Sequence, residues 1–216
     1  MALSRSGPVS PPRPRTTKTP GMSVSICSSG SRFPVSGTPP FFTYFELGEP
    51  LVVSSEVYLA QSNNSSPWTN RILPYFRDVN RTASRVVRRL GRGFGATAMT
   101  VRIFLAGGND TDLAALLSDP FLLDIIERPG IIAAQLWRVA QDASAQPGQD
   151  RGLRPGNDEI SDLTLFIEVT EIMHFESLTS DPAFAAILAD TTPSKPPRVA
   201  IHQLLNGAKS DEAPSI

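Results

Sequence analysis

The sequence predicts an α+β fold in which helices cover one face of an antiparallel sheet. Between residues 96 and 205, segments with the period of strands and segments with the spacing of helices follow in the order β-α-β-β-α-β. A shorter segment, residues 41–90, repeats only strand, helix, strand. The longer order is that of a ferredoxin-like module, whose two helices leave the other face of the sheet bare.

The complete copy is defined by apolar residues at every second position, which mark its strands. One helix is expected before the Pro129-Gly130 stop, and another begins at Ser180-Asp181-Pro182. The strands are expected over residues 99–105, 131–139, 163–169 and 199–204.

The incomplete copy begins with an aromatic-rich strand over residues 41–47. A short helix is expected through residues 56–60, and a second is capped by Ser66 with Pro67 at its first position. A strand over residues 84–90 ends the copy. The sequence therefore predicts a leader at 1–39, a partial module at 40–92, a complete module at 96–207 and a tail at 208–216.

The first 40 residues differ sharply in composition from the rest. They contain 9 Ser, 8 Pro and five basic residues but no acidic residue, and such a segment buries too little apolar surface to offset its ordering entropy. We expect it to be disordered. Its prolines oppose the amphipathic helix of a mitochondrial transit peptide. We expect a cytoplasmic protein, with mitochondrial import left open.

Composition and charge exclude several classes of protein. The sequence contains no run of 18 apolar residues, so it predicts no membrane-spanning helix. A single cysteine excludes a disulfide framework and a cysteine-based zinc site. The net charge of -1 hides an asymmetry. Residues 1–95 carry 12 basic and 4 acidic residues, whereas residues 96–216 carry more acidic than basic residues. The arginine run at 81–92 lacks interleaved aromatic residues and lies on an expected edge strand, which argues against nucleic-acid binding.

Several motifs carry a resemblance to a known family. These are Pro129-Gly130 before an apolar strand, a strand ending in Thr170-Glu171, the segment 180–184, and the segments 54–58 and 66–71 in the first copy. Over residues 40 to 205 the chain resembles the dimeric α/β-barrel superfamily. It is most similar to the EthD-like group and to uncharacterised fungal and bacterial proteins with two tandem modules.

The resemblance implies a barrel around a ligand. The bare sheet face would pair with a second sheet, as a homodimer or as an intrachain pseudo-dimer. The superfamily includes cofactor-independent monooxygenases, haem-degrading enzymes and plain binding proteins, so the fold alone does not choose an activity. The chain departs from the tandem pattern because a strand-helix-strand expected before Phe41 is replaced by the leader. Either the first module is degenerate or the start of the gene is wrongly placed.

Strand parity predicts which side chains face the barrel. On the strand at 163–169 and just past it, Phe166, Glu168 and Thr170 face inward; Arg102 and Phe104 do so on the neighbouring strand. We expect Arg102 and Glu168 to meet across the ladder. Such a pair could polarise or deprotonate a ligand, or could be a purely structural ion pair.

Four further residues complete the candidate site. Gln135 and Trp137 are expected to face inward, with Trp137 as a flat wall for a ligand. His174 is a candidate acid or base, and His202 a candidate ligand-binding residue. Two isolated histidines do not form a metal site, so neither a metal nor a cofactor is expected.

Two functions remain from these observations. The first is a cofactor-independent enzyme or a binding protein for an aromatic or polyketide-like small molecule. The alternative is a non-catalytic dimerisation or assembly module, in which the basic first half docks on the acidic second half of a partner.

Overall fold

A computed structural model describes residues 26–37, 41–48, 50–76, 79–106, 114–115, 117–145, 152–153, 158–190 and 193–209. These residues form one seven-stranded sheet in the order β2-β1-β7-β4-β6-β5-β3, in which every neighbouring pair is antiparallel. The strands are β1 (Ile26–Gly37), β2 (Phe42–Leu47), β3 (Ser84–Gly91), β4 (Thr97–Leu105), β5 (Ile131–Val139), β6 (Leu163–Val169) and β7 (Pro193–Lys209).

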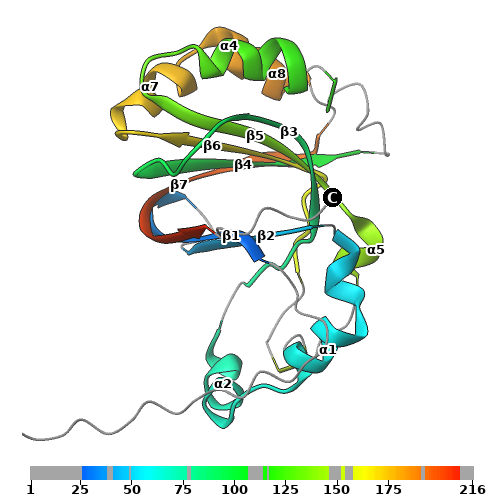
Figure 1. The fold of residues 1–216 in the computed structure, drawn as a ribbon. Coiled ribbons are helices and arrows are strands. Elements are labelled where there is room, and N and C mark those ends of the chain that lie inside the picture. Colours follow the sequence, from blue (N-terminus) through cyan, green and yellow to red (C-terminus); the bar gives the residue numbers. More distant parts are fainter. Residues whose placement is uncertain are drawn as a thin grey trace, which may run out of the picture.

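Most helices of the second half of the chain lie on one face of the sheet (Figure 1). They are α4 (Leu122–Ile126), which continues a π-helical turn at Leu117–Phe121, α7 (Met173–Thr179) and α8 (Pro182–Asp190); the short α5 (Gln141–Ser144) lies apart from them. In the first half, α1 (Glu56–Asn63) and α2 (Pro67–Ile72) lie far from the other group, flanked by 3-10 turns at Pro50–Ser54 and Leu73–Tyr75. No helix among the described residues is long and apolar enough to cross a membrane.

The complete module has the expected ferredoxin-like arrangement. Its strands stand in the order β7-β4-β6-β5, with the first strand between the fourth and the third. Met99, Val101 and Ile103 of β4 point to the helices and are fully buried there, together with apolar residues of β6 and of the helices. Phe121 and Phe184 stack with ring centroids 5.6 Å apart. The α+β prediction is confirmed.

The expectation of a disordered segment over residues 1–39 is wrong for residues 26–37, which form β1 in the interior of the sheet. This strand pairs with β2 on one side and β7 on the other. Its backbone therefore finds hydrogen-bond partners on both edges, which a composition averaged over 40 residues does not reveal. Residues 1–25 lie outside the described part of the chain.

Both copies contribute to one continuous sheet. The first copy supplies β1, β2 and β3, so it holds one more strand than the sequence predicts. The last strand also extends to Lys209, beyond the expected start of the tail at residue 208. In the second helix of the first copy, Ser66 caps the N-terminus by accepting a hydrogen bond from the backbone N–H of Thr69.

The sheet curls so that one of its edges faces its other half (Figure 1). Aromatic rings of β2 contact rings of β5 and β6, although these strands are far apart in the strand order. Because seven antiparallel strands place β2 and β3 at the edges with the same direction, these edges cannot complete an antiparallel barrel by pairing. Side chains of Glu46 and Arg89 join them instead.

Candidate functional site

An aromatic cluster fills the space between β2 and the opposite half of the sheet. Phe166 of β6 lies at its centre, with Trp137 of β5 stacked at 4.9 Å and Tyr44 of β2 edge-on at 5.2 Å between centroids. Phe42 lies 5.6 Å from both Phe166 and His202. All five rings project from the face opposite the helices, as alternation along each strand requires. Phe166 and His202 are fully buried within the cluster, whereas Phe42, Tyr44 and Trp137 are half-buried and partly open to solvent.

A buried ion pair lies against this cluster. The Arg32 guanidinium of β1 donates to Glu168 Oε1 of β6, and the side chains are 0% and 2% exposed. Arg32 Nη1 also donates to the carbonyl oxygen of Gly95 at 3.2 Å, and Cζ of Arg32 lies 5.6 Å from the centroid of Phe166. The pair therefore places a carboxylate and a cation beside the aromatic rings.

Gly95 brings the backbone close to this carboxylate. Its N–H donates to Glu168 Oε1 at 3.3 Å. A Cβ atom at this position would lie 2.6 Å from the backbone N and O of Val169 and 2.9 Å from Cβ of Glu168. Only glycine allows this approach, so the residue type at 95 is part of the site's construction.

Burial sets the proton affinities in the site. Burial raises the pKa of Glu168, and the positive charge of Arg32 and the Gly95 N–H oppose that shift. Burial, together with the negative charge of Glu168, raises the pKa of Tyr44 to about 12. Tyr44 therefore stays a neutral phenol, while Glu168 accepts a proton more readily than an exposed carboxylate.

A second polar chain leads from the edges of the sheet to the cluster. Arg89 of β3 donates to Glu46 of β2 and, at 3.2 Å, to Gln135 Oε1 of β5. The same Oε1 atom accepts a hydrogen bond from the Trp137 indole N–H at 2.9 Å. The ion pair that joins the two edge strands thus also orients the indole ring.

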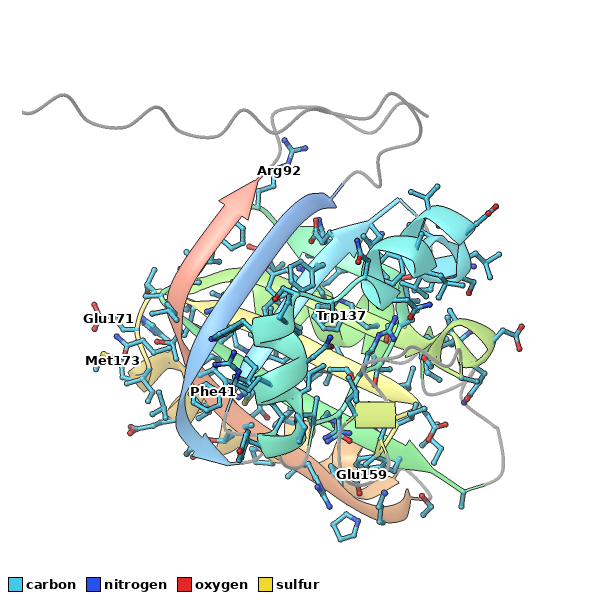
Figure 2. The ribbon with its side chains drawn as sticks, turned by 90° about the horizontal axis from the view of Figure 1, so that it is seen from below. Phe41, Arg92, Trp137, Glu159, Glu171 and Met173 are labelled. Carbon is cyan, nitrogen blue, oxygen red and sulfur yellow. The ribbon has the colours of Figure 1, made fainter. Side chains whose placement is uncertain are left out.

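The structure brings together five of the predicted site residues. Glu168 takes part in the ion pair, and Gln135 lies in the polar chain beside the cluster. Trp137, Phe166 and His202 belong to the cluster itself, and Figure 2 shows Trp137 among the strands in the interior of the view.

The expected contact between Arg102 and Glu168 is wrong. In the ladder between β4 and β6, Glu168 pairs with Ala98 whereas Arg102 pairs with Thr164. The two positions are four residues apart along the strands, which is about 13 Å. The sequence correctly predicted that β4 and β6 are neighbours and that Arg102 and Glu168 point to the same face. It did not predict the register between the two strands, because the packing of the whole sheet sets it.

Three other predicted residues also lie away from the cluster. Phe104 sits beside Arg102 at the far end of β4, with Cζ of Arg102 5.3 Å from the ring centroid. His174 belongs to α7 and lies against Gly130, and the Thr170 backbone N–H donates to the Gly130 carbonyl at 2.9 Å. Figure 2 shows their neighbours Glu171 and Met173 at the periphery of the molecule. His174 and Thr170 therefore both lie beside Gly130, and no described contact joins either of them to the aromatic cluster or to the ion pair.

Sequence reasoning missed Arg32, Gly95, Phe42 and Tyr44. A signal for Arg32 exists, because it is the only charged residue between Lys18 and Glu46. A single charge in so long an uncharged stretch indicates a specific partner. Among the described residues, no group of His, Cys, Asp and Glu side chains could hold a metal ion.

Two solved structures are similar over most of both chains. An anthrone oxidase-like protein superposes with a TM-score of 0.59 at 14% identity, covering 90% of this chain and 84% of the other. A candidate monooxygenase from Fusobacterium nucleatum subsp. nucleatum superposes with a TM-score of 0.51 at 11% identity, covering 89% of this chain and 82% of the other. The chain shares its fold with both proteins. No family model and no curated protein matches the sequence, so the chemistry must be argued from the residues.

Proposed function

We propose that the protein binds an aromatic or polyketide-like small molecule against the aromatic cluster and removes a proton from it with Glu168. The observation that carries this proposal is the buried Arg32–Glu168 pair lying beside flat aromatic rings. Burial raises the pKa of Glu168, which makes its carboxylate a stronger base than an exposed one and favours a role as general base.

The proposed step is the deprotonation of a ring CH2 carbon that lies across the ring from a ketone and is conjugated with it through the flanking aromatic rings. The C–H bond breaks, the proton moves to the Glu168 carboxylate, and the electron pair is delocalised through the rings onto the ketone oxygen to form a phenolate-type anion. The Arg32 guanidinium stabilises the negative charge that develops on this oxygen. Stacking on the half-buried Trp137 ring would hold the substrate plane in place.

The anthrone oxidase-like protein with the same fold suggests a substrate class. An anthrone is a flat, three-ring ketone with an acidic ring CH2 group. In the complete reaction that CH2 group and one dioxygen would give a second ring carbonyl and one water, with dioxygen as the oxidant. The finer placement among EthD-like proteins remains a prediction, as do cofactor independence and the pairing of the barrel with a second copy.

The test uses anthrone as the probe. Binding is followed by quenching of Trp137 fluorescence in a Trp68→Phe background, and turnover by dioxygen uptake. Glu168→Gln keeps the shape of the side chain but leaves Arg32 without its counter-charge, so folding of the variant is checked first by urea denaturation; in the folded variant, turnover should fall by about 10²- to 10⁴-fold while anthrone binding changes much less. Glu171→Gln removes an exposed carboxylate and is the matched control. Equal turnover in the two variants would exclude Glu168 as the base.

A second candidate function, assembly without catalysis, is favoured by apolar side chains on the first half of the sheet. Phe45 of β2 and Leu205 of β7 are 59% and 58% exposed, and Val35 of β1 is 46% exposed. Under this candidate, sedimentation equilibrium would show a dimer that Phe45→Asp converts to a monomer. A monomer at all concentrations would exclude it.

A further inference from the structure

Four charged side chains meet at the end of the sheet opposite the Arg32–Glu168 pair. Arg102 of β4 stands directly across the ladder from Arg198 of β7, and Lys195 lies further along the same strand. Glu159, in the segment before β6, accepts from Lys195 Nζ at 2.6 Å and lies 2.7 Å from Arg198 Nη1. Figure 2 shows Glu159 at one end of the molecule, away from Trp137.

The positive charges exceed what this carboxylate balances. Arg102 Nη1 is 3.9 Å from Glu159 Oε2, so within the described ranges all three cations share the one anion of Glu159, which leaves two positive charges in this group of four side chains. Like charges directly opposite each other on a ladder destabilise it. The nearby carboxylates of Asp158 and Asp162 accept hydrogen bonds elsewhere, from the backbone N–H groups of Arg81 and Leu105. The cluster of Arg102, Lys195, Arg198 and Glu159, here called the cationic end, therefore has a deficit of negative charge.

Arg102 itself has capacity for a further acceptor. The residue is only 8% exposed, and its Nη2 donates to the backbone carbonyl of Glu159. Its Nη1 atom is buried and makes no hydrogen bond within the described part of the chain. A buried guanidinium nitrogen without an acceptor costs stability, and an oxyanion is the ligand that would satisfy it. Lys195 and Arg198 have side chains 41% and 45% exposed, so they are open to solvent beside it.

We propose that the cationic end binds a phosphate dianion or the phosphoryl group of a small organic molecule, held by Arg102, Lys195 and Arg198. A dianion balances the two excess charges, whereas a carboxylate balances one. The guanidinium forks and the ammonium group provide the donors that phosphate oxygens accept. The centroid of the buried Phe104 ring lies 4.1 Å from Lys195 Nζ, so this ring packs against the ammonium group and helps to fix its place in the site. This site is independent of Glu168 and of the function proposed for it.

Calorimetric titration at pH 8 and low salt tests the proposal, with inorganic phosphate and phenyl phosphate as probes. We expect one saturable site per chain. Arg102→Gln should weaken binding of the probe by about tenfold or more, and Arg198→Gln and Lys195→Gln should also weaken it. These last two residues are half-exposed, so their variants report on the site even if Arg102→Gln does not fold. Glu159→Gln should strengthen binding, since it removes the competing negative charge.

The matched control is Arg88→Gln, which removes a comparably exposed arginine that pairs with Asp119 on another part of the surface. It should leave binding unchanged. Tighter binding of phenyl phosphate than of inorganic phosphate would identify a phosphorylated aromatic compound as the ligand, and equal binding would identify free phosphate. The proposal is overturned by the lack of saturable binding of either probe, by weaker binding in Glu159→Gln, or by equal losses in Arg88→Gln and Arg198→Gln.

Discussion

Arg32 and Glu168 are 136 residues apart in the sequence, yet their side chains form an ion pair that is almost completely removed from solvent. The pair joins β1, from the first half of the chain, to β6, at the centre of the complete module. Each charge is costly to bury alone, so each residue depends on the other for its place in the fold.

Removing Arg32 alone should destabilise the protein strongly. In Arg32→Leu, Glu168 stays buried without its counter-charge, and we expect a loss of about 3–5 kcal/mol in the free energy of unfolding. The double variant Arg32→Leu with Glu168→Leu should recover most of this loss, because apolar replacement of a whole buried pair is often close to neutral. Urea denaturation of the two single variants and the double variant measures the coupling. Additive losses would show that the pair contributes no interaction energy.

The pH dependence of stability should carry the signature of Glu168. Because burial raises its pKa in the folded chain, the folded state binds the proton more strongly than the unfolded state does. Its contribution is therefore fully present below the ordinary pKa of 4.5 and decreases as pH rises through the folded pKa. Urea denaturation across this range should show wild type losing stability relative to Glu168→Gln as pH rises. Wild type gaining stability relative to Glu168→Gln as pH rises would instead indicate a lowered pKa of Glu168 in the folded chain.

The faces of the strands could be predicted from the sequence because alternation fixes them without knowledge of the partners. Phe166 and Glu168 on β6, and Gln135 and Trp137 on β5, face the cluster as parity predicts. Register could not be predicted in this way, because no local pattern states which residue of β4 stands opposite Glu168. Arg102, the predicted partner of Glu168, therefore lies four positions along β4 from the residue that does stand opposite Glu168.

The partner that Glu168 does have was hidden by composition. Residues 26–37 are rich in serine and glycine, and they form a strand because β2 and β7 pair with their backbone rather than because their side chains are apolar. Long-range pairing of this kind overrides a local estimate of disorder. Gly95 lies between the two predicted modules, and no sequence pattern marks it, since the close approach of its backbone to Val169 exists only in the folded sheet.

Adding a methyl group at Gly95 should disturb the site directly. In Gly95→Ala the new Cβ would collide with backbone atoms of Val169, which cannot move aside as a side chain end could. We expect a loss of about 1–3 kcal/mol in the free energy of unfolding, as overpacking of a core typically causes. Gly48→Ala is the matched control, because a Cβ there meets nothing within 4 Å. Equal stability of the two variants would contradict the close packing around Gly95.

The Glu46–Arg89 pair should affect the site more than it affects stability. The two edge strands run in the same direction, so these side chains, rather than an antiparallel backbone ladder, hold β2 against β3. The pair is partly exposed, and Glu46→Gln should change the free energy of unfolding by less than about 1 kcal/mol. Arg89 would then hold Gln135, and through it the Trp137 indole, less firmly.

The measurement is acrylamide quenching of Trp137 in a Trp68→Phe background, which removes the emission of the exposed Trp68. Quenching should increase in Glu46→Gln, and high salt should increase it in the parent chain but little in the variant, because salt screens an ion pair that the variant has already lost. Glu56→Gln, an exposed carboxylate on α1, is the control and should leave quenching unchanged. If acrylamide quenches Trp137 fluorescence equally in Glu46→Gln and in the parent chain at every salt concentration, the ion pair does not hold the two edges together. The aromatic contacts of Phe42 and Tyr44 would then hold them alone.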